Sequence, residues 1–212
     1  MNVLVNLRGT NGSGKSTIAI QMLEKEKDNY QVICLNNNNR SPKITLFPGL
    51  GWLVLGTYFN KTGGLDTYKN NIDTENALNR VLYNYPKYDI LMEGIISSTI
   101  LSTYITLFNT VKDNIEQGVI PPRKIIIATF VTPLDICVDR VRARNDKEPN
   151  IKIMDSKRRS CIKNISLFKQ AGFISIGLDS SNTPIERMLP NFLRTCNKYR
   201  KNIQRSKPSR NY

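Results

Sequence analysis

A glycine-rich motif near the start of the chain limits its possible folds more than any other feature. Residues 9–16 read GTNGSGKS, which matches the spacing G-x-x-x-x-G-K-[ST] at every fixed position. Apolar residues between Val3 and Leu7 predict a buried strand before the motif, and the apolar spacing over residues 17–27 predicts a helix after it. A strand, a glycine-rich loop and a helix in this order predict a loop that binds the phosphates of a nucleotide.

The residue types of this loop suit a triphosphate that carries a magnesium ion. Glycines let backbone N–H groups turn towards an anion, and the positive end of the following helix dipole points at the same place. Lys15 is expected to reach the β- and γ-phosphates, and Ser16 is expected to bind Mg²⁺. The predicted cofactors are therefore ATP and Mg²⁺. The predicted nucleotide-binding residues are Gly9, Thr10, Asn11, Gly12, Ser13, Gly14, Lys15, Ser16 and Thr17.

Strand-like and helix-like segments alternate along the rest of the chain, which favours an α/β fold. The alternation predicts a P-loop NTPase fold with about five parallel strands and helices on both faces of the sheet. The five predicted strands lie near residues 1–7, 31–35, 88–92, 124–131 and 173–177. Residues 52–55 are apolar as well and are interpreted either as a short strand or as a hydrophobic plug.

Residues 1–190 are expected to form one kinase-like domain. Residues 40–72 are rich in proline and glycine and are interpreted as an insertion on the acceptor side of the site. Residues 140–160 are interpreted as a lid-like region, and residues 191–212 as a basic tail.

The charge of the chain is strongly positive and is unevenly distributed. There are 31 lysines and arginines against 17 acidic residues, which gives a net charge of +14. Residues 191–212 contain seven basic residues and no acidic residue, so half of the net charge falls on them. We expect this segment to be disordered when free and to contact DNA through phosphates, although a purely solubilising tail has the same composition.

The composition also excludes some classes of chemistry. The chain has no histidine, so a general base must be Asp, Glu, Lys or Tyr, and a histidine-rich zinc site is excluded. Four cysteines without C-x-x-C spacing favour a reducing, cytoplasmic setting. The apolar run at residues 125–128 is far too short to cross a membrane, and a strand at the very start argues against a signal peptide.

Two acidic residues are candidates for the reacting site. Glu93 ends the apolar strand that begins near residue 88, where ligands of parallel sheets bind, and can hold Mg²⁺ or orient the acceptor hydroxyl. Asp66 follows the pair Gly63-Gly64, where the backbone can approach a ligand, and can accept the proton of a hydroxyl group. The alternative interpretations are a surface acid at a strand end for Glu93 and an ordinary turn for Asp66.

Basic residues after the fourth predicted strand are candidates for a lid over the triphosphate. Arg140 and Arg144 are four residues apart on one face of a predicted helix and can stabilise charge on the transferred phosphoryl group. Lys157, Arg158 and Arg159 are predicted to open the next helix, where positive charge favours an anionic partner. A solvated basic face is the alternative for both groups. Four aromatic residues of the irregular segment are candidates either for base stacking or for the core: Phe47, Trp52, Tyr58 and Phe59.

Several short motifs together resemble a known group of enzymes. They are residues 8–17, Gly56-x-Tyr58, Gly63-Gly64-x-Asp66 and Met92-Glu93-Gly94. Over about residues 1–180 the chain resembles bacteriophage 5-hydroxymethyluracil DNA kinases, within the P-loop nucleoside and nucleotide kinases. The resemblance implies phosphorylation of the hydroxymethyl group of a modified base in DNA, a step of thymidine hypermodification.

The resemblance also implies roles for the candidate residues, and two other functions remain open. It implies ATP on residues 12–17, either Asp66 or Glu93 near the acceptor, and Arg140 with Arg144 over the phosphates. A kinase of free nucleosides or nucleotides shares this fold and chemistry but needs no basic tail. A nucleic-acid-stimulated P-loop ATPase is the third hypothesis, and two lid-like arginines within the same chain argue against it.

Overall fold

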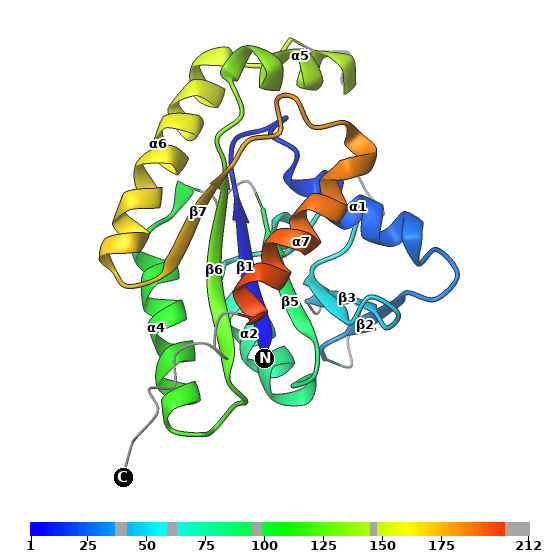
Figure 1. Cartoon of the computed structure of the whole chain (residues 1–212), viewed down its shortest axis with the longest axis vertical. Coiled ribbons are helices and arrows are strands. Elements are labelled where there is room, and N and C mark those ends of the chain that lie inside the picture. Colours follow the sequence, from blue (N-terminus) through cyan, green and yellow to red (C-terminus); the bar gives the residue numbers. More distant parts are fainter. Residues whose placement is uncertain (37–41, 59–62, 95–98, 145–147, 202–212) are drawn as a thin grey trace, which may run out of the picture.

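The strand that precedes the glycine-rich motif lies at the centre of a mixed sheet (Figure 1). The computed structural model describes residues 1–36, 42–58, 63–94, 99–144 and 148–201. Among these residues, seven strands form one sheet in the order β2-β3-β4-β5-β1-β6-β7. Their bounds are β1 Asn2–Arg8, β2 Gln31–Cys34, β3 Lys43–Phe47, β4 Trp52–Leu55, β5 Asp89–Glu93, β6 Arg123–Phe130 and β7 Ile174–Leu178.

The α/β P-loop architecture is confirmed, but the predicted number of about five strands is wrong. The additional strands, β3 and β4, form a hairpin inside residues 40–72 and belong to the main sheet. β3 is antiparallel to both of its neighbours, and the remaining paired strands are parallel. These two strands are short and almost entirely buried, so they lack the alternation of polar and apolar residues that marks a half-exposed strand.

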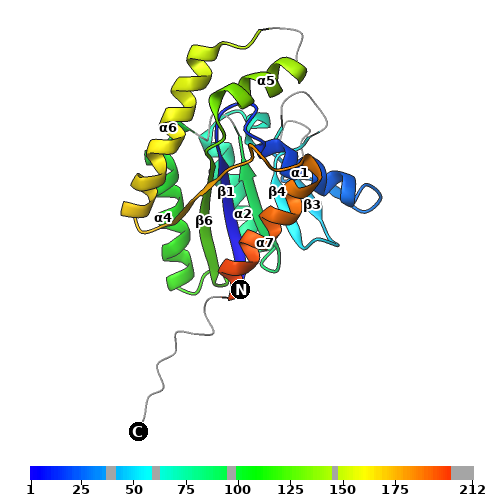
Figure 2. The same cartoon turned by 45° about the horizontal axis from the view of Figure 1, so that its top comes forward.

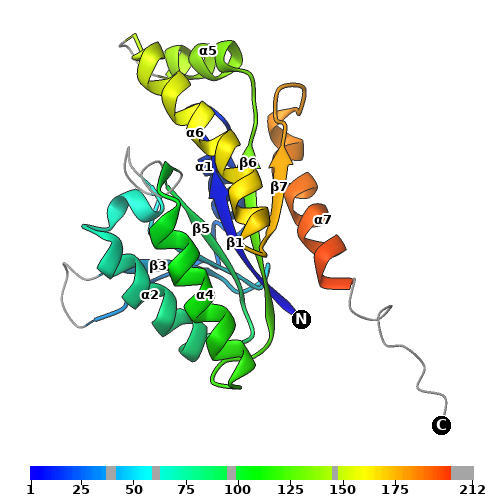
Figure 3. The same ribbon diagram turned by 90° about the vertical axis from the view of Figure 1, so that its left-hand side faces the viewer.

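Helices cover both faces of the sheet, as predicted. Their bounds are α1 Lys15–Lys25, α2 Asn71–Asn84, α4 Ser102–Glu116, α5 Leu134–Arg144, α6 Ile151–Gln170 and α7 Met188–Lys201, with short 3₁₀ turns η1 at Leu65–Thr67 and η2 at Ile185–Arg187. Helices α2, α4 and α6 lie on one face, and α1 and α7 lie on the other (Figure 3). Alternating residues of β1 supply both cores, because Leu4 packs with the first group and Val3, Val5 and Leu7 pack with the second.

The helix α7 overturns the expectation that residues 191–201 are disordered. Phe192 and Cys196 are buried, and the Phe192 ring lies 5.4 Å from the ring of Trp52. Arg200 forms an ion pair with Asp89 and also lies over the Trp52 ring at 5.7 Å. Residues 202–212 lie outside the described residues. Basic residues on the exposed side of α7 concealed an amphipathic helix whose apolar side completes the core.

The helix α6 begins earlier than the sequence pattern predicts. It starts at Ile151, and the side chain of Asn150 caps it by accepting a hydrogen bond of 3.1 Å from the Ile153 N–H. The segment 157–159 therefore lies beyond the first turn, and the prediction that it opens the helix is wrong. None of the helices in the described ranges combines the length and the hydropathy that a bilayer-spanning helix needs.

Candidate active site

The glycine-rich loop sits at the carboxyl end of β1, directly beneath α5 (Figure 2). Gly14, with φ 104°, is the N-cap of α1, and Gly12 has φ 73°, so both have backbone conformations that favour glycine. A Cβ atom on Gly12 would clash with the carbonyl oxygen of Cys137 in the first turn of α5. This contact shows why the position needs glycine: the loop packs backbone to backbone against the start of α5.

A cavity of about 530 Å³ opens beside this loop and has the size of a small-molecule site. Residues 11–17 form one wall, and Arg140 and Arg144 of α5 line it as well. Ile185 and Met188, which lie at η2 and the start of α7, supply apolar surface. The arrangement offers backbone donors, two guanidinium groups and an apolar wall, which together suit a nucleoside triphosphate.

Lys15 lies inside the loop with only 4% of its side chain exposed. Its ammonium group donates hydrogen bonds of 2.8 Å to the Gly9 carbonyl and 3.0 Å to the Thr10 carbonyl. Burial lowers the pKa of Lys15, and the nearby carboxylate of Glu93 opposes that shift. The loop therefore holds a cation next to the place where phosphates would bind.

Glu93 is the last residue of β5, and the strand register places it beside Leu7 of β1. The carboxylate is buried, with 1% exposed, and accepts a hydrogen bond of 2.9 Å from the Tyr58 hydroxyl. The Ser16 hydroxyl lies 3.3 Å from both oxygens of the same carboxylate. Burial raises the pKa of Glu93, while the positive charge of Lys15 and the hydrogen bonds act against that rise.

The oxygen atoms of Ser16 and Glu93 fit the preferences of a magnesium ion. Both are hard ligands, and their 3.3 Å separation places a hydroxyl and a carboxylate side by side next to the phosphate loop. Within the described residues, no group of three or more potential metal-binding side chains is present. Mg²⁺ commonly takes one or two protein oxygens and completes its shell with water and phosphate oxygens.

Asp66 lies in η1, and the backbone of Gly64 brings this turn against Glu93. A Cβ atom on Gly64 would stand 2.6 Å from a Glu93 carboxylate oxygen and would clash with the Glu93 carbonyl. The charge of Asp66 acts on Lys15, Glu93 and Tyr58, raising the pKa of each of these groups. Asp66 also lines a cavity of about 200 Å³ on the side of α2 and α4. The structure therefore brings the two candidate carboxylates together.

The lid-like arginines have different surroundings. Arg140 donates a 2.7 Å hydrogen bond to the Ser180 carbonyl, a 2.8 Å bond to the Ser180 hydroxyl and a 3.4 Å bond to the Gly12 carbonyl. Ser180 in turn donates to the Ser13 carbonyl at 2.9 Å. Arg140 therefore ties α5 to the phosphate loop, whereas the exposed Arg144 lines the cavity.

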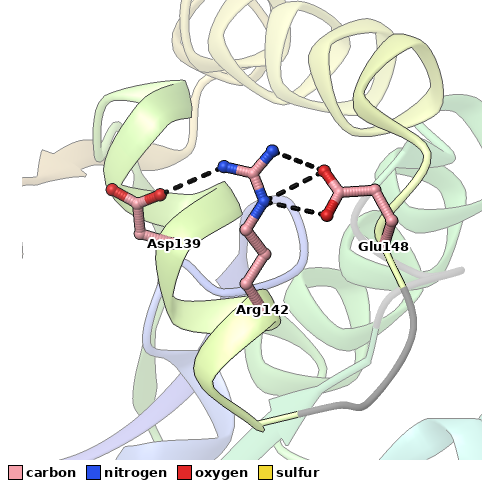
Figure 4. Close-up of polar contacts among 3 residues, drawn as sticks. All are labelled: Asp139, Arg142 and Glu148. Atoms are coloured by element: carbon pink, nitrogen blue, oxygen red, sulfur yellow. Dashed lines mark hydrogen bonds and ion pairs between the residues drawn. The ribbon is translucent and has the colours of Figure 1, made fainter.

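Other basic side chains of the region bind protein groups. Arg142 pairs with Glu148 through hydrogen bonds of 2.9 and 3.0 Å from its Nε atom and also contacts Asp139 (Figure 4). Arg158 donates a 2.8 Å hydrogen bond to the Thr132 carbonyl, and Arg159 forms an ion pair with Asp155 at 3.1 Å. Arg142, Arg158 and Arg159 are therefore paired with groups of the protein itself, so their positions need no anionic ligand.

Comparison with known proteins agrees with the site geometry. The family model described as "5-hmdU DNA kinase" matches residues 2–170. The chain belongs to the 5-hmdU DNA kinase family. A 5-hmdU DNA kinase of Bacillus phage SP10 is 39% identical over 182 residues, covering 84% of this chain and 27% of the relative. The 5-hmdU DNA kinase 1 of Salmonella phage ViI is 35% identical over 147 residues, covering 67% of this chain and 59% of the relative.

The chain thus spans about a quarter of the first relative's length and less than two thirds of the second's. Among solved structures, a gluconokinase from Sinorhizobium meliloti aligns at a TM-score of 0.49 with 10% identity, covering 95% of each chain. A deoxyadenosine kinase from M. mycoides aligns at a TM-score of 0.40 with 13% identity, covering 92% of this chain and 100% of the other. Because both TM-scores are below 0.5, we assign the fold from the strand order and the glycine-rich loop of this 5-hmdU DNA kinase family member, and not from these structures.

Sequence reasoning did not foresee all the residues that shape the site in this 5-hmdU DNA kinase family member. Tyr58 was a candidate for base stacking, yet its hydroxyl binds Glu93. Phe47 and Trp52 are core residues, and Phe59 lies outside the described residues. Ser180 was not singled out, although it follows β7 at the carboxyl edge of the sheet. Applying the strand-end rule to that last strand would have indicated it.

Replacing Gly64 with alanine is expected to reduce turnover by about tenfold or more, because the new methyl group would displace the Glu93 carboxylate. The control is Gly51→Ala. Gly51 also has a positive φ, 70°, but a Cβ atom there would meet nothing within 4 Å. Both substitutions strain the backbone, and the strain is larger at Gly64, whose φ of 60° and ψ of −140° lie outside the left-handed helical region. Thermal melting therefore accompanies the kinetics. Steady-state kinetics and thermal melting of both variants test this prediction, and equal activity in the two would contradict it.

Proposed function

We propose that this chain transfers the γ-phosphoryl group of ATP to the hydroxymethyl group of 5-hydroxymethyluracil in DNA, within the host cytoplasm. Membership of the 5-hmdU DNA kinase family indicates the acceptor. The observation that carries the chemistry is that Glu93 accepts hydrogen bonds from the Ser16 hydroxyl of the phosphate loop, while the charges of Glu93 and Asp66 both act on Lys15. A cation, a metal-binding pair of oxygens and a further carboxylate are the groups that phosphoryl transfer to an alcohol requires.

The proposed reaction is an in-line displacement at the γ-phosphorus. The acceptor hydroxyl oxygen forms a bond to this phosphorus while the bond from phosphorus to the β–γ bridging oxygen breaks, and ADP leaves. The hydroxyl proton passes to a carboxylate of the protein. Lys15 stabilises negative charge on the phosphates, and Arg144 contributes from α5. Arg140 holds Gly12 and Ser180 in place and so orients the loop.

We assign different roles to the two carboxylates. Glu93 shares its oxygens with the Ser16 hydroxyl and with Tyr58, so its position suits the metal side of the reaction. Mg²⁺ bound by Ser16 and Glu93 would neutralise charge on the phosphates. Asp66 is partly exposed and lines the cavity on the side of α2 and α4, so we assign the proton-accepting role to Asp66.

Basic side chains far from the site are proposed to hold DNA through its phosphates. A groove of about 860 Å³ runs between α1 and α7, and Lys25, Arg194, Lys198 and Lys201 line it together with Glu24 and Glu186. The C-terminal end of α7 lies beside the chain's N-terminus, at the end of the sheet that is farthest from α5 (Figures 1 and 2). Contacts there would raise DNA affinity and its salt dependence without touching the reacting groups.

The decisive experiment follows the label from γ-labelled ATP in the presence of Mg²⁺. Three acceptors are compared: DNA with 5-hydroxymethyluracil, the same DNA with thymine, and free 5-hydroxymethyl-2′-deoxyuridine. We expect strong label on the modified DNA, much weaker label on the free nucleoside and none on the DNA with thymine. Label on the free nucleoside but on neither DNA would replace the proposal by a nucleoside kinase. ATP hydrolysis stimulated by DNA, with no labelled DNA, would replace it by an ATPase.

A further inference from the structure

A polar groove on the face of the sheet that carries α2 and α4 leads to Asp66. Its inner cavity of about 200 Å³ contains Asp66 and Tyr68, and its outer cavity of about 360 Å³ extends along α4 to Thr110. The two cavities share three lining residues, Asn71, Thr74 and Tyr104. They are therefore neighbouring parts of one depression, here called the α2–α4 groove, which is lined by residues of the two helices. Figure 3 shows α2 and α4 side by side on this face of the sheet.

The lining of this groove consists mostly of uncharged side chains and is rich in hydrogen-bonding groups. Hydroxyl and amide side chains from Asn71, Thr74, Ser102 and Thr106 face it, while Lys69 is the one basic residue among those that line it in the described part of the chain. Asp66 and Glu75 add negative charge. In a chain with a net charge of +14, this surface is unsuited to phosphates and suited to an uncharged ligand with several donors and acceptors.

The floor of the groove is attached to the phosphate loop by a buried arginine. Arg8 is the last residue of β1, immediately before Gly9, and its guanidinium group lies 5.5 Å from the ring centre of Tyr104. The same group donates a 2.6 Å hydrogen bond to the Ile100 carbonyl, just before α4. The groove is therefore fixed in position relative to the phosphate loop, which favours a bimolecular transfer.

We propose that the α2–α4 groove binds the pyrimidine base and sugar of the acceptor nucleotide, turned out of its strand with the 5-hydroxymethyl group directed towards Asp66. This inference rests on the proposed function for the identity of the reacting group. Asp66 lines the inner cavity of about 200 Å³, which is too small for a base that stays stacked in a duplex, whereas an extruded nucleotide can enter it. Phosphates of the strand would remain outside, away from Asp66 and Glu75.

The test fills the groove without disturbing the core. Thr106 is exposed and lines the outer cavity, so Thr106→Trp should block it. Asn109 is equally exposed on the same helix and is absent from the lining of both cavities, so Asn109→Trp is the matched control. If Thr106→Trp melts early, Asn71→Ala, which removes an amide from the lining, replaces it.

The probe is free 5-hydroxymethyl-2′-deoxyuridine, which carries no phosphate, so the basic surface cannot bind it. Binding is measured by NMR titration, alongside ATP binding by calorimetry. We expect Thr106→Trp to weaken nucleoside binding by about tenfold or more and Asn71→Ala by about five- to tenfold. Asn109→Trp should stay within about twofold of the unsubstituted chain, and ATP binding should be unchanged throughout. An unsubstituted chain that does not bind the nucleoside at millimolar concentration, or a Thr106→Trp variant that binds it normally, overturns the proposal.

The two proposals can fail separately. Transfer of label to modified DNA combined with unaltered nucleoside binding in Thr106→Trp would refute the groove and leave the proposed function standing. Nucleoside binding that depends on Thr106, without any transfer to DNA, would support the groove and refute DNA as the acceptor.

Discussion

The Glu93→Gln variant is expected to turn over roughly 10²–10³-fold more slowly while remaining at least as stable as the unsubstituted chain. Glutamine has nearly the same shape and can still accept the hydrogen bonds that Tyr58 and Ser16 donate to the carboxylate. It lacks the negative charge that we assign to the binding of Mg²⁺. The loss should therefore appear in kcat and in the magnesium concentration required for activity.

The stability expectation follows from the buried charge. Burial raises the pKa of Glu93 above its ordinary value of 4.5, so between that value and the raised one the folded state binds more protons than the unfolded state. Stability of the unsubstituted chain should consequently fall as pH rises through this window. The Glu93→Gln variant has no carboxylate to titrate at this position. The difference in stability between the variant and the unsubstituted chain should therefore shift in favour of the variant as the pH rises towards neutral.

Thermal melting between pH 5 and pH 8 tests the expected stability. Kinetics over a range of Mg²⁺ concentrations test the expected loss of activity. Asp66→Asn is the matched comparison, because its expected loss of about 10²-fold or more in kcat should leave the magnesium dependence unchanged. A Glu93→Gln variant that melts well below the unsubstituted chain would mean that the charge is needed for folding. Equal magnesium dependence in the two variants would refute the assignment of roles.

Truncation is the second large effect, and its outcome depends on the position of the cut. Removing residues 191–212 should abolish folding, whereas removing residues 202–212 should leave the fold and kcat intact. The first cut deletes most of α7 and leaves the buried carboxylate of Asp89, which also accepts a 2.7 Å hydrogen bond from the Val3 N–H, without Arg200. The second cut removes Arg205, Lys207 and Arg210, three positive charges.

The expected magnitudes support this contrast. Removing a buried phenylalanine such as Phe192 costs about 3–5 kcal/mol, and the loss of Arg200 as the partner of Asp89 adds to this cost. Together these losses approach the whole stability of an ordinary domain, roughly 5–15 kcal/mol.

Circular dichroism, DNA binding at several salt concentrations and steady-state kinetics distinguish the two truncations. The shorter deletion should weaken DNA binding and flatten its salt dependence if residues 202–212 contact phosphates. DNA binding that is identical at all salt concentrations would assign DNA contact to other surfaces. A folded protein lacking residues 191–212 would contradict the structural role of α7.

Local patterns predicted the phosphate loop, the strand that ends in Glu93 and the layered α/β architecture, because each depends on short-range spacing. Residues 52–55, for which the sequence allows either a short strand or a hydrophobic plug, form β4, whereas β3 and its pairing with β4 escaped prediction because these strands are buried and lack alternation. The amphipathic character of α7 was concealed by its basic side chains. Contacts such as Tyr58 with Glu93 join segments far apart in sequence, and no local pattern encodes them. The roles of Asp66, Arg140 and Arg144 remain predictions.

The central position of β1 also determines when the molecule can acquire its shape. Leu4 pairs with Ile90 of β5 and Asn2 pairs with Arg123 of β6, so β1 waits for partners that are translated much later. Ser180, which fixes the phosphate loop at Ser13, emerges later still. Such distant pairings slow folding and leave the early apolar strand exposed during synthesis. The glycine-rich loop is thus translated well before the residues that fix it in place.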